Sequence, residues 1–400
     1  MYKRINLRPE KLKQFTRHKH PWIFSGAILG KHSINDGDLV AVYCDNLFIG
    51  NGYYNSASQI AIRLISWKEN EIIDQNFLSE KITSAIRLRY QLLENQKTSA
   101  YRIIFAESDF LPGFIVDKYN NSLILQIHTL GAEKLKTVFV AALIESYQSI
   151  YGQSPEMIYE KSEIKARRHE GLTEVHQELL FGKLIKQETI LENNLKFEVN
   201  FFDSQKTGFF IDQRVSRQII EKYSKSKKVL NLFAYTGGFS LYAARGEASK
   251  VVSLDISKPA VDQINQNFQI NKLKSDHLEI VDDAFDYLTD LEPNQFDLII
   301  LDPPAFIKSR QKIQEGIRGY LTINQKALEK LPENGLILTC SCSGALSDED
   351  FFRMLNWAAN AANCQIQVVE KISQPLDHPL TPFFPEGAYL KSYLIRKVLL

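Results

Sequence analysis

The chain of 400 residues contains few cysteines and no apolar stretch long enough to cross a membrane. The four cysteines are too few and too irregularly spaced for a disulfide framework or a zinc ribbon, so we expect reduced thiols, no metal site and a cytosolic protein. Met1 is followed by charged residues instead of the apolar core of a signal peptide, which argues against export. The cysteines are Cys44, Cys340, Cys342 and Cys364.

The chain also lacks the two glycine motifs that bind phosphorylated nucleotides. Neither G-x-G-x-x-G, which brings a backbone close to a pyrophosphate, nor G-x-x-x-x-G-K-[ST] occurs in it. These absences argue against a nicotinamide cofactor and against a nucleoside triphosphate. No internal repeat or low-complexity tract is present, and the length exceeds that of a usual single domain, so we expect two or three domains.

The net charge of only +1 conceals a basic N-terminal segment. Within the first twenty residues, Glu10 is the single acid among many lysines and arginines. A local positive field of this kind suits phosphate groups, so we expect contact with nucleic acid. Phe15 and Trp22 among the charges indicate that the segment is folded and is not a solvated tail. The cations are Lys3, Arg4, Arg8, Lys11, Lys13, Arg17 and Lys19.

The pattern of apolar runs and turn signals divides the chain into three regions. Residues 1–72 combine short β-like runs with turns and predict a small β-rich module. Residues 73–190 mix helical spacing with short strands and predict an α+β connecting domain. Residues 191–400 alternate strands with helices and predict an α/β domain with a doubly wound parallel sheet. The main runs behind this division are Asp38–Cys44, Leu47–Gly52, Gln59–Trp67, Phe77–Leu93, Tyr101–Ala106, Phe114–Asp117, Ser122–Ile127 and Ala132–Ile150.

Polar residues come directly after each predicted strand of the last region. In open α/β sheets, ligands bind just outside the carboxyl ends of the strands, so we expect these residues to meet in one cleft. The strands, each with its next residues, are Lys228–Phe233 before the turn Ala234–Ser240, Lys250–Leu254 before Asp255, Leu278–Val281 before Asp282 and Asp283, Phe296–Leu301 before Asp302, and Gly335–Thr339 before Cys340 and Cys342.

The first two strand ends predict a nucleoside cofactor. Gly237 and Gly238 let a ligand approach the backbone, and Asp255, eighteen residues after Gly237, is spaced to bind a ribose. A ligand with a ribose and no phosphate fits best, and S-adenosylmethionine is the common cofactor of that kind. Asp283 offers a carboxylate to the adenine amino group. The alternative is that Asp255 and Asp283 only cap the helices after them.

Four segments of the chain resemble the motifs of the bacterial 23S ribosomal RNA large-subunit methyltransferase I family, which consists of cytosine-5 methyltransferases with an N-terminal PUA domain. These segments are Lys206–Arg214, Asn231–Phe239, Asp302–Phe306 and Ser341–Gly344, and the likeness extends to His20–Gly26, Asp377–Pro379 and Phe384–Lys391. The resemblance therefore spans essentially the whole chain.

The resemblance implies an RNA-binding PUA pseudobarrel for residues 1–72 and a Rossmann-like class I methyltransferase domain for residues 191–400. It also implies S-adenosylmethionine as the cofactor, 23S ribosomal RNA as the partner, either free or within a precursor particle, and a cytoplasmic location. No membrane partner is expected, and a homodimer is compatible with the sequence.

The predicted binding residues combine the strand-end pattern with this resemblance. Those expected at the cofactor are Thr207, Phe210, Arg214, Phe233, Tyr235, Thr236, Gly237, Gly238, Asp255, Ser257, Asp283, Ala284 and Asp302. Those expected at RNA are Lys3, Arg4, Arg17, Lys19, Lys165, Arg167 and Arg168, the last three from a basic run whose alternative is a solvated charged loop.

The cysteines predict covalent catalysis. C5 of cytosine is a poor nucleophile, and addition of a thiolate to C6 makes C5 reactive enough to accept a methyl group. Cys340 and Cys342 lie two positions apart, so an extended segment points both the same way and spacing does not separate them. The family pattern Ser-Cys-Ser-Gly falls on Cys342, which we predict to be the nucleophile, while the family often has another residue type at the position of Cys340. The alternative is that both thiols are small buried side chains.

Asp302 is predicted to assist this chemistry. Its carboxyl group can hydrogen-bond N3 or the exocyclic amine of a flipped pyrimidine, and Pro303 and Pro304 stiffen the loop that carries it. An N-cap or a cofactor contact is the simpler alternative. A rival chemistry stays open, because many amino-group methyltransferases hold a target nitrogen with Asp or Asn before Pro-Pro and need no cysteine. A non-catalytic RNA-binding factor is a third option.

Overall fold

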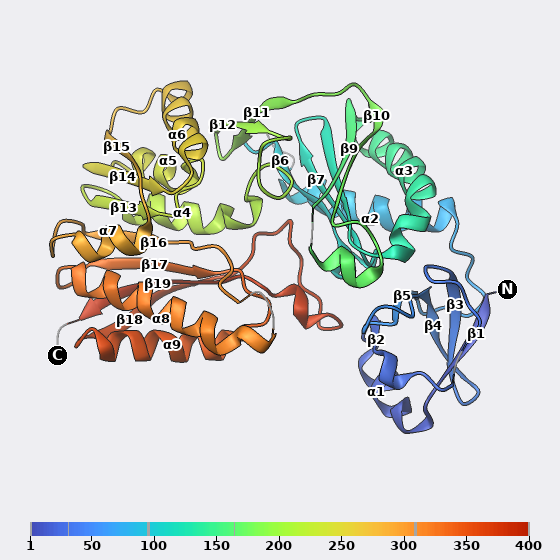
Figure 1. Cartoon of the computed structure of the whole chain (residues 1–400). Coiled ribbons are helices and arrows are strands. Elements are labelled where there is room, and N and C mark those ends of the chain that lie inside the picture. Colours follow the sequence, from blue (N-terminus) through green and yellow to red (C-terminus); the bar gives the residue numbers. More distant parts are fainter. Residues whose placement is uncertain (1, 31, 94–96, 164, 308–309, 399–400) are drawn as a thin grey trace. The chain divides into compact units, whose positions relative to one another are not determined.

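The computed structural model describes the chain apart from residues 1, 31, 94–96, 164, 308–309 and 399–400. The chain forms two compact units, each built from several segments (Figure 1). The first unit comprises Met1–Asn194, Val199–Ile211 and Leu376–Gly387, and the second comprises Leu195–Glu198, Asp212–Pro375 and Ala388–Leu400.

The first unit begins with a five-stranded sheet in the order β1-β3-β4-β5-β2. Its elements are β1 (Lys3–Leu7), α1 (Leu12–His18), β2 (Trp22–Ile23), β3 (Leu39–Cys44), β4 (Leu47–Tyr54) and β5 (Ile62–Ser66). Alternation in β3 buries Val40, Val42 and Cys44 in a core shared with Ile5 and Leu7 of β1. The predicted β-rich module is confirmed, and the basic N-terminal segment contributes strand β1 to it, in which the buried Ile5 and Leu7 alternate with the polar Arg4 and Asn6.

A second sheet of the first unit has the order β10-β9-β8-β7-β6. Its strands and helices are α2 (Gln75–Leu93), β6 (Ala100–Phe105), β7 (Phe114–Tyr119), β8 (Ser122–Ile127), α3 (Leu130–Tyr151), β9 (Met157–Glu163) and β10 (Val175–Gly182). Phe114 of β7 stacks on Phe139 of α3 with ring centroids 3.8 Å apart, and α2 packs beside α3. Sequence patterning misses β9 because Glu160 and Lys161 are charged yet fully buried.

The second unit contains a seven-stranded sheet in the order β15-β14-β13-β16-β17-β19-β18, with helices on both sides. The strands from β15 to β17 run parallel, and β19 pairs antiparallel with β17 and β18. Its strands are β13 (Lys228–Leu232), β14 (Lys250–Asp255), β15 (Asp276–Val281), β16 (Leu298–Leu301), β17 (Leu336–Ser341), β18 (Gln365–Ile372) and β19 (Lys391–Val398). The doubly wound α/β prediction is confirmed.

The helices of the second unit cover an apolar sheet. Leu230, Ile299 and Ile337, one from each of three adjacent strands, are fully buried in the main core with α8 and α9. The helices are α4 (Arg214–Tyr223), α5 (Gly238–Arg245), α6 (Lys258–Asn271), α7 (Ala284–Asp290), α8 (Ile313–Lys330) and α9 (Asp348–Ala361), and a two-stranded sheet of β11 (Gln187–Glu192) and β12 (Leu195–Asn200) precedes them.

A buried ion pair of the first unit gives a test of this fold. Arg89 of α2 is fully buried and donates two hydrogen bonds of 2.7 Å to the Asp109 carboxylate. Asp109→Ala leaves the guanidinium buried without its carboxylate, so we expect the free energy of unfolding to fall by about 3–5 kcal/mol. Asp38→Ala, which breaks the exposed Lys134–Asp38 pair, is the control and costs about 1 kcal/mol or less. Equal losses in denaturant unfolding would contradict the burial of Arg89.

Candidate functional site

The carboxyl ends of four parallel strands of the second unit lie in register. Leu232 of β13 pairs with Leu254 of β14 on one side and with Leu301 of β16 on the other, and Leu301 pairs with Thr339 of β17. The next residue along each strand therefore lies at the same edge of the sheet. Three of the predicted residues, Phe233, Asp255 and Asp302, are brought to this edge in this way.

The turn after β13 has an unusual backbone. Phe233 and Tyr235 adopt φ angles of 59° and 48°, and Gly237 has a φ of 83°. A side chain at Gly237 is also excluded by space, because a Cβ there would lie 2.8 Å from Ile264 of α6. The Asn267 amide donates a 3.0 Å hydrogen bond to the Thr236 carbonyl. Helix α6 thus holds the turn in place, while Phe233, Tyr235 and Thr236 stay partly exposed.

Asp255 is the last residue of β14, and its carboxylate accepts hydrogen bonds from two backbone amides. Its Oδ2 accepts a 2.8 Å hydrogen bond from the Tyr235 amide, and its Oδ1 accepts one of 2.9 Å from the Ser257 amide. The N-cap of α6 is Ser257, whose hydroxyl accepts from the Ala260 amide. Asp255 therefore joins the turn after β13 to the end of β14, and the helix-capping alternative is wrong for it.

Asp283, by contrast, does cap a helix. Its Oδ1 accepts hydrogen bonds of 2.7 and 3.2 Å from the amides of Phe285 and Asp286 at the start of α7, where Ala284 is the first residue. The predicted contact between Asp283 and adenine therefore depends on the other carboxylate oxygen, Oδ2, and stays a prediction.

Asp302 comes directly after β16 and is held by a glutamine. The Gln213 side-chain amide, almost completely buried in η5 (Ile211–Gln213), donates a 2.9 Å hydrogen bond to Asp302 Oδ1. The neighbouring Asp212 accepts a 2.6 Å hydrogen bond from the Tyr389 hydroxyl. The sequence motif contains Gln213 without indicating a role for it. Its place next to Arg214, a predicted cofactor residue, is the one feature of the sequence that could have marked it as part of the site.

The structure separates the two cysteines that spacing leaves equivalent. Cys340 lies within β17, is fully buried and has its sulfur 3.2 Å from the Ser392 hydroxyl. Burial, followed by the negative charge of Asp302, raises the pKa of the Cys340 thiol well above its usual value. Cys342 lies one residue beyond β17 and is partly exposed. The buried-thiol alternative therefore describes Cys340, whereas Cys342 is the accessible thiol of this strand end.

Lys391 approaches the same strand end from β19. It lies opposite Ser341 in the β17–β19 register and is only 4% exposed. Its ammonium group donates a 2.7 Å hydrogen bond to the carbonyl of Ser343. Burial lowers the pKa of Lys391 to about 8, and negative charge at Cys342 and Asp348 acts in the opposite direction. The sequence motif contains Lys391, but no sequence pattern predicts its burial.

Two different units contain the predicted cofactor residues Thr207, Phe210 and Arg214. Thr207 and Phe210 lie in the first unit, and Arg214 begins α4 in the second. The Thr207 hydroxyl is buried and donates a 2.7 Å hydrogen bond to Asp117, while the Lys206 ammonium lies 4.3 Å from the centre of the Phe210 ring. Their common role at the cofactor stays a prediction.

The predicted N-terminal RNA contacts are surface side chains of the first sheet and α1. Lys3, Arg4, Arg17 and Lys19 are all exposed. Arg4 lies over the Tyr43 ring at 4.1 Å, and the Lys3 ammonium donates a 3.2 Å hydrogen bond to the Ser33 carbonyl. These cations are placed where phosphate groups can reach them, and their contact with RNA stays a prediction.

Arg167 requires a correction. It lies in η4 (Lys165–Glu170), is only 1% exposed and donates a 2.8 Å hydrogen bond to the Thr173 carbonyl and one of 3.3 Å to Glu133. The guanidinium is thus used inside the protein, which contradicts its assignment to the RNA path. Arg168 is exposed and pairs with Glu174. Lys165 begins η4, and its side chain lies outside the described part of the structure.

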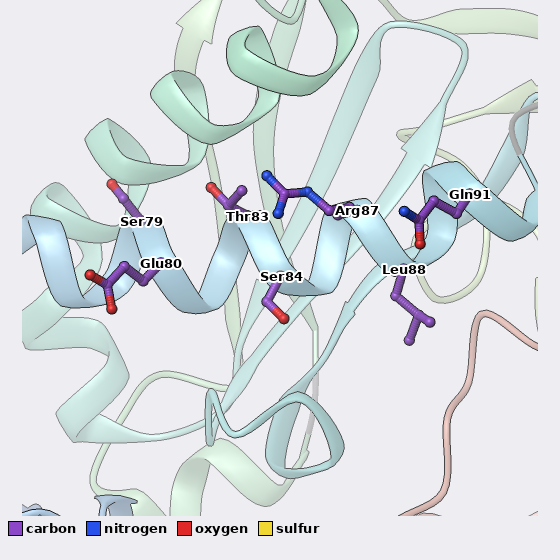
Figure 2. Close-up of a pocket in the computed structure, with 7 residues that line it drawn as sticks. All are labelled: Ser79, Glu80, Thr83, Ser84, Arg87, Leu88 and Gln91. Carbon is purple, nitrogen blue, oxygen red and sulfur yellow. The ribbon is translucent and has the colours of Figure 1, made fainter.

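Two other features do not compete with the strand-end site. The pocket in Figure 2 lies along α2 and is lined by helix side chains alone, none of them predicted at the site: Ser79, Glu80, Thr83, Ser84, Arg87, Leu88 and Gln91. Glu133, Glu160 and His176 bring potential metal ligands within 4.8 Å of one another. The Lys136 ammonium lies 2.8 Å from Glu160, so this cluster is an internal ion-pair network.

Comparisons with known proteins agree with this geometry. Residues 160–396 match the S-adenosylmethionine-dependent methyltransferase family, and residues 5–67 match a PUA-like domain. Ribosomal RNA large subunit methyltransferase I of Pseudoalteromonas atlantica is 39% identical over 405 residues, covering 100% of both chains. The chain belongs to the ribosomal RNA large subunit methyltransferase I family. The member of this family from Photobacterium profundum is also 39% identical, over 94% of this chain and 95% of its own.

A solved structure shares the fold of this family member. A proposed methyltransferase complexed with SAH has a TM-score of 0.84 and 24% identity, covering 98% of this chain and 100% of its own. The predicted family, fold class and cofactor are confirmed: the chain is an S-adenosylmethionine-dependent methyltransferase with a PUA-like domain. The strand-end residues fit this cofactor, since they offer a carboxylate and an open turn. Among the helices that the structure describes, none is long and apolar enough to span a membrane.

The role of Asp255 gives a second prediction. Asp255→Ala removes the carboxylate proposed for the ribose, so we expect S-adenosylmethionine binding to weaken by about 1.5–3 kcal/mol, the scale of a hydrogen bond to a charged group. Calorimetric titration measures this change. Asp262→Ala is the control, since it removes an exposed carboxylate of α6 that pairs with Lys258 and belongs to no predicted site. Unchanged affinity in folded Asp255→Ala protein would exclude the ribose contact.

Proposed function

We propose that the chain methylates C5 of a cytosine in 23S ribosomal RNA through a covalent bond between Cys342 and C6 of the base. The name of the relatives supports ribosomal RNA as the substrate class. The observation that carries the chemistry is the position of Cys342, which is partly exposed at the strand end next to the one that bears Asp302. The reaction takes place in the cytoplasm, where ribosomal RNA is made in bacteria.

In this mechanism Cys342 acts first, as a thiolate. Its sulfur adds to C6, the C5–C6 double bond becomes a single bond, and the displaced electrons form an enamine across C4 and C5, which lets C5 attack a methyl group. Bound S-adenosylmethionine supplies that methyl group on a positively charged sulfur. Loss of the C5 proton then restores the double bond and breaks the bond between C6 and Cys342. Every covalent change of the chain is therefore reversed within one turnover.

Asp302 orients the base. The target cytosine must leave its stack to reach a strand end, so an unpaired or easily opened segment of RNA is the expected substrate. The Asp302 carboxyl group hydrogen-bonds N3 or the exocyclic amine, and the buried Gln213 amide holds Asp302 in place. This contact stabilises the charge that develops in the ring after Cys342 adds.

The cofactor is bound by the turn after β13 and the two acids that come after β14 and β15. The backbone from Phe233 to Gly238 approaches the cofactor, Asp255 binds its ribose, and Asp283 Oδ2 accepts a hydrogen bond from the adenine amine. Asp255 also accepts a hydrogen bond from the Tyr235 amide. This contact links the proposed ribose carboxylate to the turn that is proposed to approach the cofactor. Thr207, Phe210, Arg214, Ser257 and Ala284 complete the proposed set.

The exposed N-terminal cations are proposed to bind RNA phosphates. Replacing Arg17 and Lys19 with Gln should weaken RNA binding and flatten its salt dependence, because a protein that contacts fewer phosphates releases fewer counterions when it binds. Filter binding at several salt concentrations measures both effects, and cofactor affinity should not change. The control is Lys222→Gln with Lys225→Gln, two exposed lysines whose charges are already balanced by Glu370 and Glu247. An unchanged salt slope in the Arg17 and Lys19 variant would exclude this role.

The chemistry is tested by replacing each cysteine separately. Cys342→Ala should keep cofactor and RNA binding and lose nearly all turnover, and Cys340→Ala, the matched control from the same strand end, should keep most of it. RNA with 5-fluorocytosine at the target should trap the wild-type protein as a stable conjugate, since fluorine replaces the C5 proton whose loss would release the cysteine. Cys342→Ala should form no conjugate.

Two results would move the assignment to the rival chemistry at a nitrogen. One is full activity in Cys342→Ala protein. The other is a methyl label recovered on a ring or exocyclic nitrogen, in which case the Asp302-Pro303-Pro304 segment held by Gln213 would position that nitrogen and Cys342 would take no part.

A further inference from the structure

Lys391 is buried without a carboxylate partner in the described part of the chain. It is 4% exposed, and no carboxylate there lies within the 4.0 Å of an ion pair with its ammonium group. Its hydrogen bond of 2.7 Å goes to the Ser343 carbonyl, directly after Cys342 in the chain. Burying an ammonium ion in this way destabilises the folded protein, because the ion loses its hydration. A neutral side chain of the same size would carry no such penalty.

Lys397 shows what a purely structural buried lysine looks like on the same strand. It is 8% exposed, and its ammonium group donates two hydrogen bonds of 2.7 Å to the carbonyls of Leu328 and Leu331 at the end of α8. These bonds satisfy the last carbonyls of a helix. Within the described residues, the Lys391 ammonium group makes no such helix contact, and its hydrogen bond goes to the loop that carries the proposed nucleophile.

The groups around Lys391 come from several elements. Cys342 and Asp348 at the start of α9 act on its charge directly, and Asp348 already accepts hydrogen bonds of 2.6 Å from Lys371 and 2.7 Å from the Tyr393 hydroxyl. Other titratable or charged groups of the described residues at this strand end include Tyr320 of α8, Cys340 of β17 and Asp302 after β16. Both oxygens of the Asp348 carboxylate thus already accept hydrogen bonds from other side chains. Cys342 is the other group whose negative charge the Lys391 ammonium can stabilise.

The coupling between Lys391 and Cys342 has a definite sign. Burial lowers the pKa of Lys391 to about 8, so the ammonium form still predominates at neutral pH. A negative charge on Cys342 favours the ammonium form, and by reciprocity the ammonium favours the thiolate. A free thiol has a pKa of about 8.5, so a nearby cation decides how much thiolate is present at neutral pH.

We propose that Lys391 is a positioning residue that keeps Cys342 in its thiolate form for addition to the base. The thiol proton is released to solvent, and the positive charge of the Lys391 ammonium group stabilises the thiolate that remains. The Ser343 carbonyl fixes the ammonium beside the loop. The proposal rests on the proposed function, because it assigns Lys391 to the activation of Cys342 as the nucleophile.

The test measures the reactivity of Cys342 without RNA or cofactor. The rate of alkylation by iodoacetamide is measured from pH 5 to 10, and peptide mass spectrometry reads the label at Cys342 separately from the buried Cys44, Cys340 and Cys364. Lys391→Met should move the midpoint of the rate profile upward by about one pH unit and slow alkylation at pH 7 about tenfold. Lys391→Arg, which keeps the charge, should restore most of the wild-type rate.

Lys397→Met is the matched control, because it removes a lysine of similar burial on the same strand. Its alkylation profile at Cys342 should equal that of the wild type, even if its melting temperature falls. A wild-type midpoint in folded Lys391→Met protein would overturn the proposal, and so would an equal shift in Lys397→Met, which would show a general effect of altered packing.

The result is distinguishable from a failure of the proposed function. If Lys391→Met does not shift the midpoint while Cys342→Ala is inactive, the nucleophile stands and the role of Lys391 is wrong. If Lys391→Met shifts the midpoint while Cys342→Ala remains fully active, Lys391 still controls the thiol, but the covalent mechanism is wrong.

Discussion

The register of four parallel strands is the constraint on which the site depends. Leu232, Leu254, Leu301 and Thr339 form one row across the sheet, so the residues directly after them reach a single edge. A shift of one residue in any of these pairings would point Asp255, Asp302 or Cys342 to a different side. The apolar core beneath the row, with fully buried Leu230, Ile299 and Ile337, fixes that register.

The antiparallel strand β19 brings Lys391 to the edge of the sheet where the parallel strands end. Because β19 runs against β17, its first residue lies beside the last residues of β17, and Lys391 faces Ser341. A strand that ran parallel to β17 would bring its last residue to this edge instead. The reversal thus places a buried cation against the loop that carries Cys342, while Ser392, the next residue of β19, contacts the buried thiol of Cys340.

The sequence predicts the five parallel strands of the second unit, because a buried parallel strand is a continuous apolar run that ends at a polar residue, but it does not predict the antiparallel strands β18 and β19. It predicts less where charge is buried. Strand β9 escapes prediction because Glu160 and Lys161 point inward, and the assignment of Arg167 to RNA is wrong because the protein interior uses its guanidinium. In each case long-range partners satisfy the charge, and no local pattern shows those partners.

The same limit applies to the site. Asp255, Asp302 and Cys342 can be found because each comes just after a strand or at its end, whereas Gln213 and Lys391 act through contacts with residues far along the chain. Family resemblance favours Cys342 over Cys340 where spacing alone does not. Burial gives an independent physical reason for that choice, since Cys340 is enclosed and Cys342 is accessible.

The central claim is that the methyl group is transferred to carbon C5 of a cytosine. Its most direct test is to incubate the protein with ribosomal RNA from cells that lack it and with isotopically labelled S-adenosylmethionine, to digest the RNA to nucleosides, and to identify the labelled nucleoside by mass spectrometry. The account predicts labelled 5-methylcytidine. Label found in a nucleoside methylated at nitrogen, with none in 5-methylcytidine, would contradict it.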